Sequence, residues 1–113
     1  MTPWKLIFLR EARAELKSLD GSKRNLVSKA IKKVLQNPLP QNEGGYGKPL
    51  GNKGNVNLTG CYKIKLRDAG IRIVYRLQRT EHGMEIIIIG MRESAEVCDL
   101  AAKRIEKYDI KVN

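Results

Sequence analysis

Basic side chains recur at every second position between residues 63 and 67. Lys63, Lys65 and Arg67 alternate there with apolar side chains, and Arg72 follows in the next alternating segment. A period of two places these cations on one face of a sheet and the apolar residues on the other. Like charges that face each other across strands destabilise a sheet. We therefore expect a bound polyanion to offset the repulsion between the cations on this face.

Three interpretations of this face are open from the pattern alone. It is a solvated surface, a surface that binds RNA or DNA, or a site that acts on a phosphodiester bond. Arg92 comes at the end of the last apolar segment and can join the same face. Catalysis has a route there, because nearby cations disfavour the charged form of a lysine and lower its pKa from the ordinary value near 10.4. Packing Lys65 among such neighbours would give a usable base without histidine.

The charge of the whole chain agrees with an anionic partner. The sequence has 22 Lys and Arg against 12 Asp and Glu, a formal net charge of +10 and a pI near 9.9. Such a surface attracts nucleic acid, anionic membrane or an acidic protein. The excess lies in residues 1–92, whereas residues 93–113 carry slightly more acidic than basic side chains. The C-terminal segment is therefore expected to present a different surface from the body.

Length and composition exclude several classes of protein. The 113 residues predict a single domain over residues 1–113, and 42% hydrophobic residues favour a folded globule. The longest aliphatic run, residues 86–89, falls far short of the roughly 20 residues of a membrane span. The apolar patch near the N-terminus is too short for a secretory leader, which predicts a cytoplasmic protein. With two Cys and one His, we expect no metal site and no other cofactor.

Hydrophobic periodicity predicts the N-terminal elements. Residues 5–9 form a short apolar strand, and apolar residues then recur at helical spacing up to the break at Asp20-Gly21. Ser22 can cap a second helix. That helix ends at Asn37-Pro38, because a residue before proline avoids the helical region. Residues 37–57 are rich in Pro and Gly and predict a long loop.

Three strands and a helix are predicted to complete the chain. Residues 58–67 and 71–78 alternate in the manner of half-buried strands. Residues 84–91 are apolar on both faces, as in an inner strand covered on each side, and residues 94–108 carry a helical stripe. The predicted order is β-α-α-β-β-β-α. It is an α+β fold in which a small antiparallel sheet carries an N-terminal helical hairpin and a C-terminal helix, with the helices packed on one side.

Three motifs, in their order along the chain, resemble the core of the RelE toxins. These toxins are the ribosome-dependent mRNA endonucleases of bacterial toxin–antitoxin pairs. The motifs are Cys61-Tyr62-Lys63-Ile64-Lys65-Leu66-Arg67, Gly70-x-Arg72-x-Val74-Tyr75 and Gly90-x-Arg92-Glu93-x-x-Glu96-Val97. The resemblance covers nearly the whole chain and includes the helical hairpin. It implies the fold of the RelE/ParE superfamily, a small antiparallel sheet with an N-terminal helical hairpin.

The resemblance also implies a reaction. A ribose 2′-OH attacks the adjacent phosphate and leaves a 2′,3′-cyclic phosphate, or the 3′-phosphate to which it opens, and a 5′-OH. Lys65 would be the general base, Lys63 and Arg72 would hold the phosphate, and Arg92 would protonate or stabilise the leaving 5′ oxygen. Arginine is a weak proton donor because its pKa exceeds 12, so charge stabilisation is the expected role of Arg92. The tyrosine that the family carries near its C-terminus falls at Cys98.

The implied partners are the ribosome with its mRNA and a cognate antitoxin protein, with no membrane and no small-molecule cofactor. Lys29, Lys32 and Lys33 crowd the second helix and either contact ribosomal RNA phosphates or form a solvated face. Arg67 is a further candidate RNA contact. Two other functions stay open: a ParE-like, non-enzymatic inhibitor of DNA gyrase, and a weakened homologue that only binds RNA or an antitoxin. The matching cations oppose the first, and Cys98 favours the second.

Overall fold

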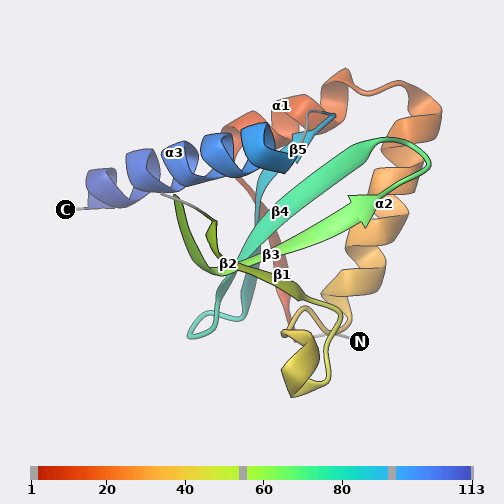
Figure 1. Cartoon of the computed structure of the whole chain (residues 1–113). Helices are drawn as coiled ribbons and strands as arrows, with labels where there is room; N and C mark the ends of the chain where they lie inside the picture. The colour runs from red at the N-terminus through yellow and green to blue at the C-terminus, as the bar shows by residue number, and fades with distance from the viewer. Residues whose placement is uncertain (1–2, 54–55, 92–93, 113) are drawn as a thin grey trace.

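A five-stranded mixed sheet forms the centre of the fold (Figure 1). The computed structural model describes residues 3–53, 56–91 and 94–112. In spatial order the strands are β1 (Lys5–Phe8), β5 (Gly83–Gly90), β4 (Ile71–Gln78), β3 (Val56–Leu66) and β2 (Lys48–Lys53). β1 runs parallel to β5, and the other neighbours are antiparallel. The α+β class is confirmed, but the expectation of a wholly antiparallel sheet is wrong at β1.

The N-terminal helical hairpin consists of α1 (Arg10–Ser18) and α2 (Gly21–Leu35), as predicted. The cap of α2 is Asp20 and not Ser22. The Asp20 carboxylate accepts hydrogen bonds from the Lys23 backbone N–H at 2.9 Å and from the Ser22 hydroxyl at 3.0 Å. An aspartate at this position both satisfies a free N–H group and places negative charge at the positive end of the helix.

The C-terminal helix, α3 (Ser94–Val112), runs four residues beyond the predicted end at residue 108. Its buried residues, Val97 and Ala101, belong to the predicted apolar stripe. None of the helices in the described residues is both long and apolar enough to cross a membrane.

The segment predicted as a long loop, residues 37–57, is largely structured. It contains a short 3₁₀ helix, η1 (Gln41–Glu43), the whole of β2 and the start of β3. The predicted element order therefore lacks one strand. Its glycines allow close packing: a Cβ atom on Gly47 would lie 2.8 Å from the Tyr75 hydroxyl oxygen and 3.0 Å from the Leu39 carbonyl oxygen. The same hydroxyl donates a 2.9 Å hydrogen bond to the carbonyl of Pro38.

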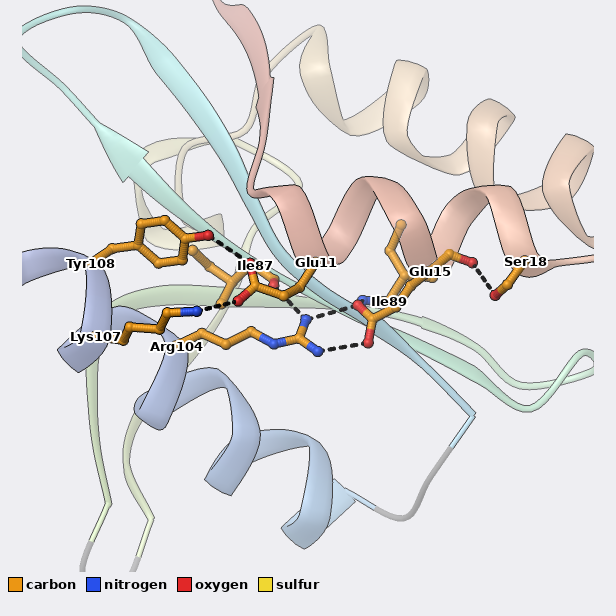
Figure 2. A network of polar contacts seen from close by, with 8 residues as sticks. All are labelled: Glu11, Glu15, Ser18, Ile87, Ile89, Arg104, Lys107 and Tyr108. Carbon is orange, nitrogen blue, oxygen red and sulfur yellow. Dashed lines mark hydrogen bonds and ion pairs between the residues drawn. The ribbon is translucent and has the colours of Figure 1, made fainter.

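Helices cover both faces of the sheet. Ile86 to Ile89 are consecutive in β5 and all are at most 3% exposed, so both faces of this strand are covered, as its sequence predicted. α1 and α2 lie on one side of the sheet and α3 lies on the other (Figures 1 and 2). The expectation that the helices pack on one side is therefore wrong. The continuous apolar run in β5 is the sequence signal that contradicted it.

A polar network joins α1 to α3 along the outer edge of β5 (Figure 2). β1 stops at Phe8, and side chains then take its place along β5. The backbone N–H of Ile89 donates to Glu15 at 3.1 Å, and the Ile87 carbonyl accepts from Arg104 at 3.0 Å. The Arg104 guanidinium also forms two 2.8 Å hydrogen bonds to the Glu15 carboxylate. These contacts satisfy backbone groups that a neighbouring strand would otherwise pair.

A second set of contacts extends the network by one helical turn. The Tyr108 hydroxyl donates to Glu11 at 2.6 Å, and the Lys107 ammonium lies 3.1 Å from the same carboxylate. The hydrogen bond from Tyr108 is the main reason why the pKa of Glu11 falls to about 2. Tyr108 thus helps to fix α3 on the body of the protein.

We predict that Arg104→Ala lowers the free energy of unfolding by about 1–3 kcal/mol, because Glu15 and the Ile87 carbonyl lose a charged donor in a partly buried place. Urea denaturation measures the change. Lys103→Ala removes an exposed neighbour on the same helix and is the control. Equal stabilities of the two variants would show that the network contributes nothing.

Candidate active site

The pairing of β3 with β4 gathers the predicted cations. Lys65 lies directly opposite Arg72. Residues directly opposite each other in an antiparallel pair project to the same face. On the other face, Ile73 is buried in the core opposite Ile64. Lys63, two residues before Lys65, shares the face of the cations.

The turn between the two strands sets this register. It spans Arg67–Gly70 and is closed by a 3.2 Å hydrogen bond from the Gly70 N–H to the Arg67 carbonyl. Gly70 has φ +68°, a left-handed conformation that favours glycine. Arg67 begins the turn beside Lys65, so the turn adds a further cation to the same end of the hairpin.

Neighbouring positive charge lowers the pKa of Lys65. The largest contribution comes from Arg72, followed by Arg67, by desolvation and by Lys63 and Lys48. Lys65 itself is exposed, whereas Lys63 and Arg72 are half-buried. Each cation makes protonation of Lys65 less favourable, which increases the share of neutral amine at a given pH. Such an amine can accept a proton while its neighbours hold an anion.

A surface pocket lies at this end of the hairpin. It is lined by Lys65, Leu66, Arg67, Gly70, Ile71 and Arg72. Three cations around one hollow suit an anion such as a phosphate group. Among the described residues, no group of three His, Cys, Asp or Glu side chains lies close enough together to hold a metal ion.

Lys48 is a member of this face that the sequence prediction missed. It begins β2 and lies directly opposite Lys63. Because residues 37–57 were predicted as a loop, no strand register could be assigned to Lys48. The only available signal was a basic residue before a proline, and that pattern does not specify a partner strand.

Two residues that the sequence placed in the site, Arg92 and Cys98, are not part of the described cluster of cations on β3 and β4. Arg92 lies outside the described residues, so its role stays a prediction. Cys98 is a half-buried free thiol on α3 that packs against the core. The Tyr75 hydroxyl, on the apolar face of β4, reaches Pro38 just after α2, which places α2 on the side of that face, and α3 lies on the other side of the sheet. Cys98 therefore belongs to the helix on the side of the cations.

The lysines of α2 form a separate surface. Lys29, Lys32 and Lys33 are all exposed, and their spacing places them on one side of the helix. α2 lies across the sheet from the cationic face, so the structure does not bring these lysines together with Lys65. Lys32 and Lys33 are in the last turn, where cations interact favourably with the helix dipole.

Sequence comparisons relate the chain to known toxins. No family model matches it. The mRNA interferase toxin RelE of Escherichia coli K12 is 33% identical over 100 residues, which cover 88% of this chain and 95% of that protein. A putative RelE-like toxin protein from Escherichia coli is 32% identical over 99 residues, or 87% of this chain and 93% of that protein.

Solved structures show the same relationship. A double arginine-to-alanine mutant of the E. coli toxin RelE in the free state is similar with a TM-score of 0.71 and 30% identity, covering 93% of this chain and 99% of that one. A RelE mutant bound to a peptide of the antitoxin RelB gives 0.64 and 30%, with coverages of 89% and 96%. The intact E. coli RelBE toxin–antitoxin complex gives 0.61 and 29%, with coverages of 80% and 98%.

Proposed function

The chain belongs to the RelE family of toxins, and we propose that it is the toxin of a toxin–antitoxin pair that cleaves messenger RNA in the ribosomal A site. The observation that carries this proposal is the β3–β4 register, which places Lys65 among other cations and lowers its pKa. Phosphate binding alone needs only positive charge. A lysine that more readily gives up its proton also supports proton transfer, and therefore catalysis. The similarity to the mRNA interferase toxin RelE of Escherichia coli agrees with this choice.

The proposed reaction is an in-line transesterification. The neutral Lys65 amine takes the proton of the ribose 2′-OH, and the 2′ oxygen forms a bond to the adjacent phosphorus. The bond from phosphorus to the 5′ oxygen breaks, which leaves a 2′,3′-cyclic phosphate and a 5′ oxygen that takes a proton from solvent water to become a 5′-OH. Lys63 and Arg72 hold the phosphate and stabilise its developing charge. Arg92 stabilises the leaving oxygen. These side chains supply the positive charge, so the proposed reaction uses no metal or cofactor.

This chain differs from the RelE family at the position where the family carries a tyrosine near its C-terminus. Cys98 stands there, and a thiol cannot stack on a base as a phenol ring does. We propose that the charge chemistry is retained and that the substrate base is held less firmly. A homologue weakened in catalysis, which binds RNA or an antitoxin only, is the second candidate function and is favoured by this one residue.

The proposed partners are a ribosome and a cognate antitoxin. Exposed Lys29, Lys32 and Lys33 would contact ribosomal RNA phosphates, and Arg67 would contact the mRNA beside the site. An acidic or amphipathic antitoxin would bury the cationic face or displace α3. Such displacement is possible because α3 is a separate terminal helix, held by the polar network and by the small buried side chains Val97 and Ala101.

We predict that Lys65→Ala lowers single-turnover mRNA cleavage on programmed ribosomes by about 10²–10³-fold, because the site loses a preorganised charge and its base. Mapping of mRNA 5′ ends measures the cuts. Lys65→Arg is the matched control: it keeps the charge but cannot act as a base, so it should bind ribosomes like the parent and cleave slowly.

Three results would contradict the proposal that this protein cleaves mRNA with Lys65 as the base. Undiminished cleavage by both variants would remove Lys65 from the chemistry. DNA breaks trapped with gyrase, without codon-phased mRNA cuts, would indicate the ParE-like function. Ribosome or antitoxin binding without cleavage by the parent would indicate the weakened homologue. Urea denaturation of each variant checks that its fold is intact.

We predict that Cys98→Tyr raises ribosome-dependent cleavage by roughly ten- to a hundredfold, because one base stack is worth about 1–3 kcal/mol. Cys98→Ala should change the rate little. Single-turnover rates of the three proteins test this prediction. If alanine abolishes cleavage and tyrosine gives no gain, the thiol acts directly in the reaction and the stacking explanation is wrong.

A further inference from the structure

Lys48 occupies a defined place beside the candidate active site. β2 pairs with β3 in antiparallel register, and Lys48 lies directly opposite Lys63. Directly opposite residues project to the same face with Cβ atoms about 4.5–5.5 Å apart. Lys48 is exposed and therefore extends the cationic face by one strand, from β3 to β2.

The backbone around Lys48 holds it in this position. Pro49 follows it, and a residue before proline is restricted to extended conformations. Pro49 pairs with Tyr62, and the register then shifts between Pro49 and Gly51. Such irregularities commonly redirect a strand next to a functional site. Lys48 is thus the first residue of β2, and only Lys48 and Pro49 are paired with β3 before this shift.

Among the described residues, the charge of the cationic face is compensated at Arg76, near β5, but not at the lysines of β3 and β2. Arg76 shares the cationic face of β4, but its guanidinium lies 2.8 Å from the Glu85 carboxylate. Among the described residues, no ion pair involves Lys48, Lys63 or Lys65. A polyanion that lies along Arg72 and Lys63 therefore meets the positive charge of Lys48 if it continues toward β2.

We propose that Lys48 is a positioning residue that binds the phosphate next to the scissile one. This inference rests on the proposed function, because it takes the phosphate near Lys65 and Arg72 as the reacting group. Neighbouring strands are about 4.8 Å apart, so Lys48 lies about two strand spacings from the level of β4. RNA carries one phosphate per nucleotide, and an extended strand that crosses the sheet presents its next phosphate in this direction. A lysine on a flexible stem suits this task, since it attracts a phosphate without fixing its orientation.

If Lys48 had a purely structural role, its loss would have different effects. β2 is an edge strand, and lysines on edge strands hinder edge-to-edge association. In that role, loss of Lys48 would increase self-association and leave RNA binding unchanged. As a positioning residue, its loss weakens substrate binding and leaves the chemical step nearly unchanged.

The experiment measures binding and cleavage with the full chain. Binding is measured on ribosomes programmed with mRNA that carries a 2′-deoxy nucleotide at the cut site, which prevents the reaction. Lys48→Ala should weaken binding about three- to tenfold and reduce the slope of log affinity against log salt by about 1, as expected for one lost phosphate contact. The limiting single-turnover rate on ordinary mRNA should change less than threefold. Lys48→Arg should restore binding, and Lys17→Ala, at an exposed site on α1, should have no effect.

A neutral methylphosphonate identifies the phosphate involved. Placed on the neighbouring linkage, 5′ or 3′ of the cut site, it should weaken binding of the parent as much as Lys48→Ala does. It should cause no further loss in the Lys48→Ala variant. The linkage at which the two losses fail to add is the one that Lys48 binds.

Several outcomes would overturn the proposal. These are full additivity at both linkages, binding equal to that of Lys17→Ala, or self-association as the only change. A fall in the limiting rate with unchanged binding would also overturn it. If the parent binds programmed ribosomes but does not cleave ordinary mRNA, the proposed function fails, and the methylphosphonate comparison still decides the role of Lys48.

Discussion

The antiparallel pairing of β3 with β4 holds Lys65 opposite Arg72, and the candidate site depends on this pairing. The apolar face of the same hairpin fixes the register, because a slip by one residue would turn buried Ile73 toward solvent and its cationic neighbours toward the core. Burial of one such side chain contributes about 1.5–3 kcal/mol, which exceeds the roughly 0.2–1 kcal/mol typical of a single cross-strand side-chain interaction. Packing therefore outweighs repulsion and keeps the cations together.

The helices α2 and α3 lie on opposite sides of the β3–β4 hairpin. α2 covers the apolar face, and α3 lies on the cationic side with Cys98. The place of α3 depends on Glu15 and Arg104, which also complete the hydrogen bonding of β5 beyond the end of β1. The Glu15–Arg104 ion pair thus satisfies backbone groups at the edge of β5 and also holds α3 in place.

The sequence predicted the hairpin and its charges because alternation is a local signal. It predicted the inner position of β5 because a continuous apolar run is also a local signal. It missed β2, and Lys48 with it, because that strand is defined by its pairing with β3 and carries no periodic pattern. The parallel direction of β1 and the choice of Asp20 as a cap were not encoded in periodicity either. Arg92 and the RNA contacts of the α2 lysines stay predictions.

The β3–β4 register lowers the pKa of Lys65 through neighbouring positive charge. Titration of the side-chain amines by nitrogen-detected NMR in the folded protein measures this pKa directly. We expect Lys65 to titrate below the ordinary lysine value, and we expect Arg72→Gln to raise its pKa, since the largest source of repulsion is gone. A Lys65 that titrates at the ordinary lysine value and does not respond to Arg72→Gln would show that the neighbouring charges have no such effect.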